Sequence, residues 1–244
     1  MDNNDFVNET GAVEVSKRIL RLYWLVDVSA SMSGKKIGEV NYAITEVIPD
    51  LQDEAAKNYT VQMNVRAMKF GKGAAWHTSE TKIENFEWTY VDADAPRTDT
   101  GAALALMAEE LTEENLGAGR GLPPVIILMS DGEATDDYES GIQKLLAQKW
   151  GRKAIRIAIA IGADADTEQL LKFCSNPKEC PPIEATNARK LVDSITWASV
   201  AVSQSVSQAK VGNSEDNIIP LPPMPQETIA LGAETTEDED DDVF

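Results

Sequence analysis

Hydrophobic and polar positions follow two alternating patterns along the chain. Three short, nearly continuous apolar runs have the pattern of strands covered on both faces, at residues 19–26, 125–129 and 154–161. Between them, apolar residues recur every three or four positions, which predicts helices at 37–51, 101–116 and 138–150. Strands that alternate with helices indicate βαβ units. We therefore expect an α/β fold: a Rossmann-like, doubly wound, mostly parallel central sheet flanked by helices.

Shorter segments complete this pattern. Residues 61–70 alternate as a strand does, and 76–78, 86–90 and 183–185 predict shorter strands. Two helix starts are also indicated, because Thr167 can cap a helix that runs to Cys174, and Asn187 can cap a last helix over 188–207.

The composition divides the chain into three segments. We expect a polar leader at 1–17, a folded domain at 18–208 and a Pro-containing acidic tail at 209–244. Between 211 and 244 there are ten acidic residues and no Lys or Arg, which predicts disorder. Three roles stay open for the tail: a solubilising segment, a docking site for a basic partner, or a source of a carboxylate for a metal.

The charge and the apolar content limit the possible partners and compartments. The net charge is −19 and no basic stripe is present, so we expect no nucleic acid as a partner. The apolar runs are too short to span a bilayer, the first residues do not resemble a secretory signal, and two cysteines give no disulfide framework. These features predict a cytoplasmic protein without a membrane contact.

Three distant segments are rich in small oxygen-bearing side chains: Asp27-Val28-Ser29-Ala30-Ser31, Thr98-Asp99-Thr100-Gly101 and Ser130-Asp131-Gly132-Glu133. The first and third directly follow predicted buried strands, and ligands in such sheets bind beyond the carboxyl ends of the strands. Carboxylates and hydroxyls without Cys or His suit Mg²⁺, or Mn²⁺, rather than zinc. The sequence thus predicts a metal site with room for waters and one outside ligand.

The order and spacing of these segments resemble the metal-ion-dependent adhesion site (MIDAS) of von Willebrand factor A (vWA) domains. That pattern is D-x-S-x-S, a Thr roughly 70 residues on and an Asp about 30 further on. The resemblance runs from about Ile19 to about Val206. Two departures leave the ligands intact: many family members have Gly where this chain has Ala30, and Thr where it has Ser130.

The resemblance implies a role for each residue of the site. Ser29 and Ser31 would bind the metal through their hydroxyls, and Asp27 and Asp131 would act directly or through waters. Thr98 would bind from a second loop; the Gly three residues later favours it over Thr100, which remains the alternative. An acidic side chain from a protein partner would complete the coordination. Asp136 and Asp137 either extend this acidic rim or begin the next helix.

Three further segments are similar to the TerY-type proteins of bacterial tellurium-resistance clusters: 22–29, 128–137 and 197–203. This likeness implies a scaffold or regulator in a stress response, associated with a protein kinase and a PP2C-type phosphatase.

Two functions other than a binding module also place an aspartate or a metal at the end of a strand. A Mg²⁺-dependent phosphatase of the haloacid dehalogenase type needs a second carboxylate where this chain has Ser29, and His77 is the only histidine. An accessory subunit of an AAA-type ATPase remains open, although the chain has no G-x-x-x-x-G-K-[ST] motif of its own. We therefore expect a metal-dependent protein-binding module that is not an enzyme.

Overall fold

One sheet organises the part of the chain that the computed structural model describes, residues 17–118, 121–208 and 221. Its strand order is β3-β2-β1-β5-β6-β7, with β4 paired to β2 at the side of β3. The pairings of β2, β1, β5, β6 and β7 are parallel, whereas β3 and β4 run antiparallel to β2. The strands are β1 Arg18–Asp27, β2 Val61–Gly71, β3 Gly73–Trp76, β4 Thr81–Lys82, β5 Val125–Ser130, β6 Ile155–Ile161 and β7 Ile183–Ala185.

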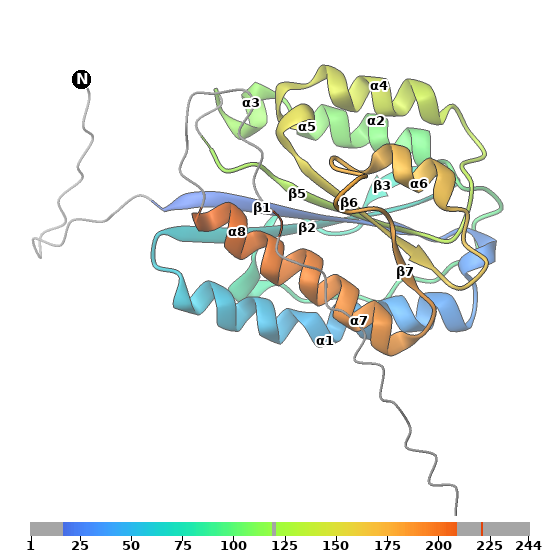
Figure 1. The fold of residues 1–244 in the computed structure, drawn as a ribbon, viewed down its shortest axis with the longest axis horizontal. Coiled ribbons are helices and arrows are strands. Elements are labelled where there is room, and N and C mark those ends of the chain that lie inside the picture. Colours follow the sequence, from blue (N-terminus) through green and yellow to red (C-terminus); the bar gives the residue numbers. More distant parts are fainter. Residues whose placement is uncertain (1–16, 119–120, 209–220, 222–244) are drawn as a thin grey trace, which may run out of the picture.

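Helices cover both faces of the sheet, as Figure 1 shows. The long α1 lies with α7 and α8 on one face, and α2, α4, α5 and α6 lie on the other. The helices are α1 Lys35–Lys57, α2 Thr100–Glu110, α3 Glu113–Leu116, α4 Tyr138–Ala147, α5 Lys149–Lys153, α6 Thr167–Phe173, α7 Ala188–Thr196 and α8 Val202–Gln208. The doubly wound, mostly parallel fold expected from the sequence is confirmed.

The apolar run of β1 reflects burial on both sides. Leu22 and Trp24 face the core beneath α1, whereas Tyr23 and Leu25 face the core beneath α2 and α4, and all four are fully buried. Trp24 also donates a hydrogen bond from Nε1 to Ser199 Oγ (3.3 Å), in a π-helical segment at 197–201 that joins α7 to α8. The central strand is therefore held from both layers.

The prediction of a strand at 86–90 is wrong, because these residues form no strand. The strand predicted at 76–78 lies slightly earlier, as β3. The 86–90 segment instead packs against α1, with Phe86 buried. The side chain of Asn41 holds this loop: it donates to Val91 O (2.8 Å) and accepts from Val91 N and Trp88 Nε1 (both 3.0 Å). The apolar side chains of this segment pack against the core, as predicted, but its backbone is not paired with a strand.

Helix ends also differ in detail from the predictions. The helix expected at 101–116 is interrupted where Thr112 caps α3, and the one expected at 138–150 is interrupted at Gln148. Asp166 rather than Thr167 caps α6, whereas Asn187 caps α7 as predicted.

The leader predicted at 1–17 and the tail predicted at 209–244 lie outside the described residues, except for Lys17 and Leu221. None of the described helices is long and apolar enough to cross a membrane.

Candidate metal centre

The topology brings the first and third polar segments together. β1 and β5 are adjacent parallel strands, with Val26 opposite Met129, so their carboxyl ends lie side by side. Asp27 is the last residue of β1, and Asp131 directly follows β5. Ser31 lies in a short 3₁₀ turn, Ala30–Met32, that leads into α1, and Ser29 is the residue just before this turn.

Hydrogen bonds join four of the five predicted ligands. Asp27 is fully buried and accepts from the backbone N–H of Ser29 (Oδ1, 2.8 Å) and from Ser130 Oγ (Oδ2, 2.6 Å). Ser29 Oγ lies 2.9 Å from Ser31 Oγ, and Ser31 Oγ donates to Asp131 Oδ1 (2.8 Å). Asp27 thus lies behind the serines and orients their turn, while the serines and Asp131 present a row of three oxygens.

The spacing of these three oxygens fits an octahedral metal. Ligand oxygens lie about 2.1 Å from Mg²⁺, so neighbouring ligands at right angles are about 3.0 Å apart. The two successive separations of 2.9 and 2.8 Å are hydrogen-bond lengths, and they lie close enough to that edge length for a metal to replace the shared protons with small shifts. Among the described residues no group of three or more His, Cys, Asp or Glu could hold a metal, and the oxygens beside Asp131 here are serine hydroxyls.

The second segment lies beside the third. Thr98 is buried, its N–H donates to Thr135 Oγ1 (3.0 Å), and its carbonyl accepts from Thr135 N (2.8 Å). Thr100 is the first residue of α2 and is also buried. Within the described part of the chain, no hydrogen bond joins either threonine hydroxyl to the other four residues, so the choice of Thr98 over Thr100 stays a prediction.

The two acidic residues after the third segment have structural roles. The Asp136 carboxylate accepts from the N–H groups of Gly101 and Ala102 (both 2.8 Å) at the start of α2. Asp137 caps α4, where it accepts from Ser140 N (3.0 Å). Asp137 therefore begins the next helix, one of its two predicted roles. The role of Asp136 at a helix distant in sequence was missed.

Glycines let the two helices beside the site meet at backbone distance. A Cβ on Gly101 would lie 2.4 Å from Asp137 O, and one on Gly141 would lie 2.4 Å from Gly101 O. Figure 1 shows α2 and α4 packed side by side over the sheet. Together with the Asp136 bonds, this contact ties the loop of Thr98 to the loop of Asp131.

Sequence reasoning also missed Lys36. Its Nζ donates to Asp131 Oδ2 (2.6 Å) and lies 3.0 Å from Asp164 Oδ1, in the loop that follows β6. Its only sequence signal was its position five residues after the D-x-S-x-S segment. Partial burial opposes the charged form of Lys36, but the bonds to the two carboxylates outweigh it and raise its pKa. Burial also raises the pKa of Asp27, despite the hydrogen bonds from Ser130 and Ser29.

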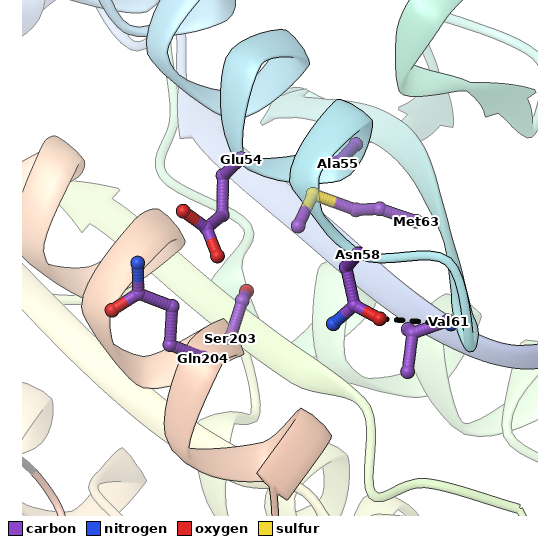
Figure 2. Close-up of a pocket in the computed structure, with 7 residues that line it drawn as sticks. All are labelled: Glu54, Ala55, Asn58, Val61, Met63, Ser203 and Gln204. Atoms are coloured by element: carbon purple, nitrogen blue, oxygen red, sulfur yellow. Dashed lines mark hydrogen bonds between the residues drawn. The ribbon is translucent and has the colours of Figure 1, made fainter.

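A small hollow lies at the other end of the parallel strands, near the amino end of β2. Figure 2 shows the end of α1 facing α8 across it. Its lining is formed by Glu54, Ala55, Asn58, Val61, Met63, Ser203 and Gln204. It has room for about one water molecule, too little for an organic ligand. The carboxyl edge is therefore the better candidate for a functional site.

The sheet order, the helical layers and the polar loops at the carboxyl edge define an α/β domain with an oxygen-rich site. Residues 22–197 match the family described as von Willebrand factor type A domain, and the chain belongs to that family. Among curated relatives, human inter-alpha-trypsin inhibitor heavy chain H6 is 30% identical over 151 residues, and cuticlin-6 of Caenorhabditis elegans is 31% identical over 118 residues. The matches cover 59% and 46% of this chain but only 11% and 19% of those proteins.

Solved structures of low sequence identity share the fold. Proximal thread matrix protein 1 from the mussel byssus has a TM-score of 0.54 and 17% identity, over 77% of this chain and 48% of that one. Another structure of the same mussel protein is described as having a zinc-occupied MIDAS motif. The ArnB paralog VWA2 from Sulfolobus acidocaldarius has a TM-score of 0.53 and 16% identity, over 76% of this chain and 46% of that one.

Proposed function

We propose that this chain is a metal-dependent protein-binding module and not an enzyme. Asp27, Ser29, Ser31, Thr98 and Asp131 would hold Mg²⁺, with Mn²⁺ as an alternative, and an acidic side chain of a protein partner would complete the coordination. The observation that carries this proposal is the row of three oxygens from Ser29, Ser31 and Asp131, spaced at 2.9 and 2.8 Å.

The chemistry of the chain's own residues supports binding. Asp27 accepts two hydrogen bonds and orients the serine turn, and Asp131 supplies the negative charge that a divalent ion requires. When bound, the metal would supply Lewis acidity toward a carboxylate ligand. The zinc described for the mussel protein supports a divalent ion in this fold. Hard oxygen donors without thiolate or imidazole favour Mg²⁺ or Mn²⁺ for this chain.

Metal binding is tested first with variants that change one hydroxyl. Wild type, Ser31→Ala and Ser33→Ala are titrated with Mg²⁺ and Mn²⁺ by calorimetry, and their melting temperatures are recorded with metal and with EDTA. Ser33 is the matched control, because it is exposed and lies two residues beyond the site. We expect wild type and Ser33→Ala to bind and to be stabilised, and Ser31→Ala to lose at least tenfold in affinity. Equal binding by all three proteins would refute the assignment.

For the biological setting, the likeness to TerY-type sequences supports a cytoplasmic scaffold or regulator in a bacterial stress or tellurium-resistance system, with a protein kinase and a PP2C-type phosphatase. A pull-down from native lysate with wild type and Asp27→Ala, each with Mg²⁺ and with EDTA, tests this setting. A kinase or phosphatase retained only by wild type with Mg²⁺ is the expected result. Retention of an AAA-type ATPase instead would support the accessory-subunit function.

A further inference from the structure

Lys36 and Ser31 use different oxygens of the same carboxylate. Ser31 Oγ donates to Asp131 Oδ1 (2.8 Å), on the side of the serine turn, and Lys36 Nζ donates to Asp131 Oδ2 (2.6 Å). The ammonium therefore contacts the candidate metal ligand directly, next to the row of hydroxyls. A divalent ion bound at Oδ1 and the lysine at Oδ2 would share one negative group.

Lys36 is held between the loops that follow β5 and β6. Asp164 holds the ammonium from the far side, at 3.0 Å. Gly162 leaves space for the lysine stem, since a Cβ there would lie 2.8 Å from Lys36 Cε, and its φ of 92° favours glycine as well. The Lys36 side chain is 22% exposed, compared with 80% for that of Lys35. This lysine is thus held in place, whereas its neighbour extends into solvent.

The charges around the site require a counter-ion. Asp27 and Asp131 are both buried, and Lys36 is the cation that the structure places in hydrogen-bond contact with Asp131. Buried carboxylates without a cation destabilise a fold. Three carboxylates (Asp27, Asp131 and Asp164) and one ammonium leave the metal-free site at −2, and a divalent ion brings the sum to 0.

We propose that Lys36 is the internal counter-cation of the metal-free site, which stabilises the domain without metal and lowers its affinity for a divalent ion. This inference rests on the metal site proposed above. Repulsion between a unit charge and a divalent ion that share one carboxylate corresponds to about a tenfold change in affinity, even at the dielectric constant of water. Lys36 would therefore stabilise the metal-free form relative to the metal-loaded form.

Lys36→Met and its matched control Lys35→Met test the proposal, because the two lysines are adjacent in α1. Mg²⁺ and Mn²⁺ affinities are measured by calorimetry, and melting temperatures are recorded in EDTA and in saturating Mg²⁺. We expect Lys36→Met to bind metal about tenfold more tightly, to melt lower in EDTA and to gain more from metal than wild type. Lys35→Met should behave as wild type, and so should Lys36→Arg, which keeps the charge.

Each result separates this inference from the proposed function. If neither wild type nor Lys36→Met binds metal, the proposed metal site itself fails. If wild type binds and Lys36→Met binds equally or more weakly, the counter-cation role is overturned while the metal site stands. Should Lys36→Met unfold in EDTA, recovery of its circular dichroism spectrum with Mg²⁺ would support the role. If Lys36→Met and Lys36→Gln both stay unfolded with Mg²⁺, the role is also overturned.

Discussion

The contact between α2 and α4 can be tested with a matched pair of glycine substitutions. Gly141 is the fourth residue of α4 and is buried against Gly101, whereas Gly38 is the fourth residue of α1, is exposed, and has nothing within 4 Å of an added Cβ. Replacing either glycine by Ala in a helix interior removes the same backbone penalty, about 1 kcal/mol. The two variants therefore differ mainly in what the new methyl group meets.

The magnitude for Gly141→Ala follows from its distances. The new Cβ would lie 2.4 Å from Gly101 O, 2.7 Å from its Cα and 2.9 Å from its carbonyl carbon, all backbone atoms of α2. An ordinary contact needs about 3.4 Å, so the two helices must move apart by about 1 Å. Such overpacking costs about 1–3 kcal/mol, and more where no flexible side chain can yield. After the helix-propensity gain, we expect a net loss of about 2 kcal/mol.

Urea unfolding measures both variants, with tryptophan fluorescence and circular dichroism as independent probes. We expect the midpoint of Gly141→Ala to fall and its melting temperature to drop by about 4–8 °C, since 1 kcal/mol shifts a domain of this size by about 2–4 °C. Gly38→Ala should melt a few degrees higher than wild type. If Gly141→Ala is as stable as Gly38→Ala, the backbone contact between α2 and α4 does not exist at the stated distance.

Three further predictions concern other contacts. Asp136→Asn should destabilise the domain by about 1–2 kcal/mol in urea unfolding, because it weakens the charge-assisted bonds to Gly101 and Ala102 at the start of α2; an unchanged midpoint would contradict this. Trp24→Phe should cost about 1–3 kcal/mol in the same assay through lost volume and an unpaired Ser199, and a loss below about 0.5 kcal/mol would refute the bond's contribution. Burial, with the nearby thiol of Cys174, raises the pKa of Cys180 from 9.0 to about 12, so only the unfolded thiol ionises between those values. The contribution of the protonated Cys180 thiol to the free energy of unfolding should therefore be fully present below pH 9 and be lost as pH rises toward 12. The free energy of unfolding should fall less over this range in the double variant Cys174→Ala/Cys180→Ala. Equal declines in the two proteins would refute the thiol contribution.

The predictable features of this fold are those in which local pattern and tertiary burial agree. The continuous apolar run of β1 predicts a strand covered on both faces, and the structure buries Tyr23 and Trp24 on opposite sides of the sheet. Asp27 and Asp131 could be placed together because parallel strands end at the same edge of a sheet. The order and spacing of the three motifs, with the resemblance to the vWA metal site, selected Ser29, Ser31 and Thr98 around them.

The features that could not be predicted depend on partners distant in the sequence. The 86–90 segment has a strand-like composition, but Asn41, far upstream, accepts from the Trp88 side chain and bonds the backbone of Val91, the residue that follows the segment. Lys36 resembles an ordinary surface lysine until the loop after β6 brings Asp164 to it. The break at Thr112 is different, because Thr112 carries a local capping signal that favours a helix start.

The central place of β1 in the sheet has a consequence for the order of folding. The hydrogen bond from Ser130 to Asp27 closes a separation of 103 residues along the chain. Closing so long a loop carries a large entropic cost, and such non-local pairings form slowly. A nascent chain cannot assemble the site until β5 has been synthesised and has docked on β1. A metal that binds only the assembled site would therefore stabilise the folded domain, and it would act on the unfolding rate rather than the folding rate to the extent that the site forms after the folding transition state.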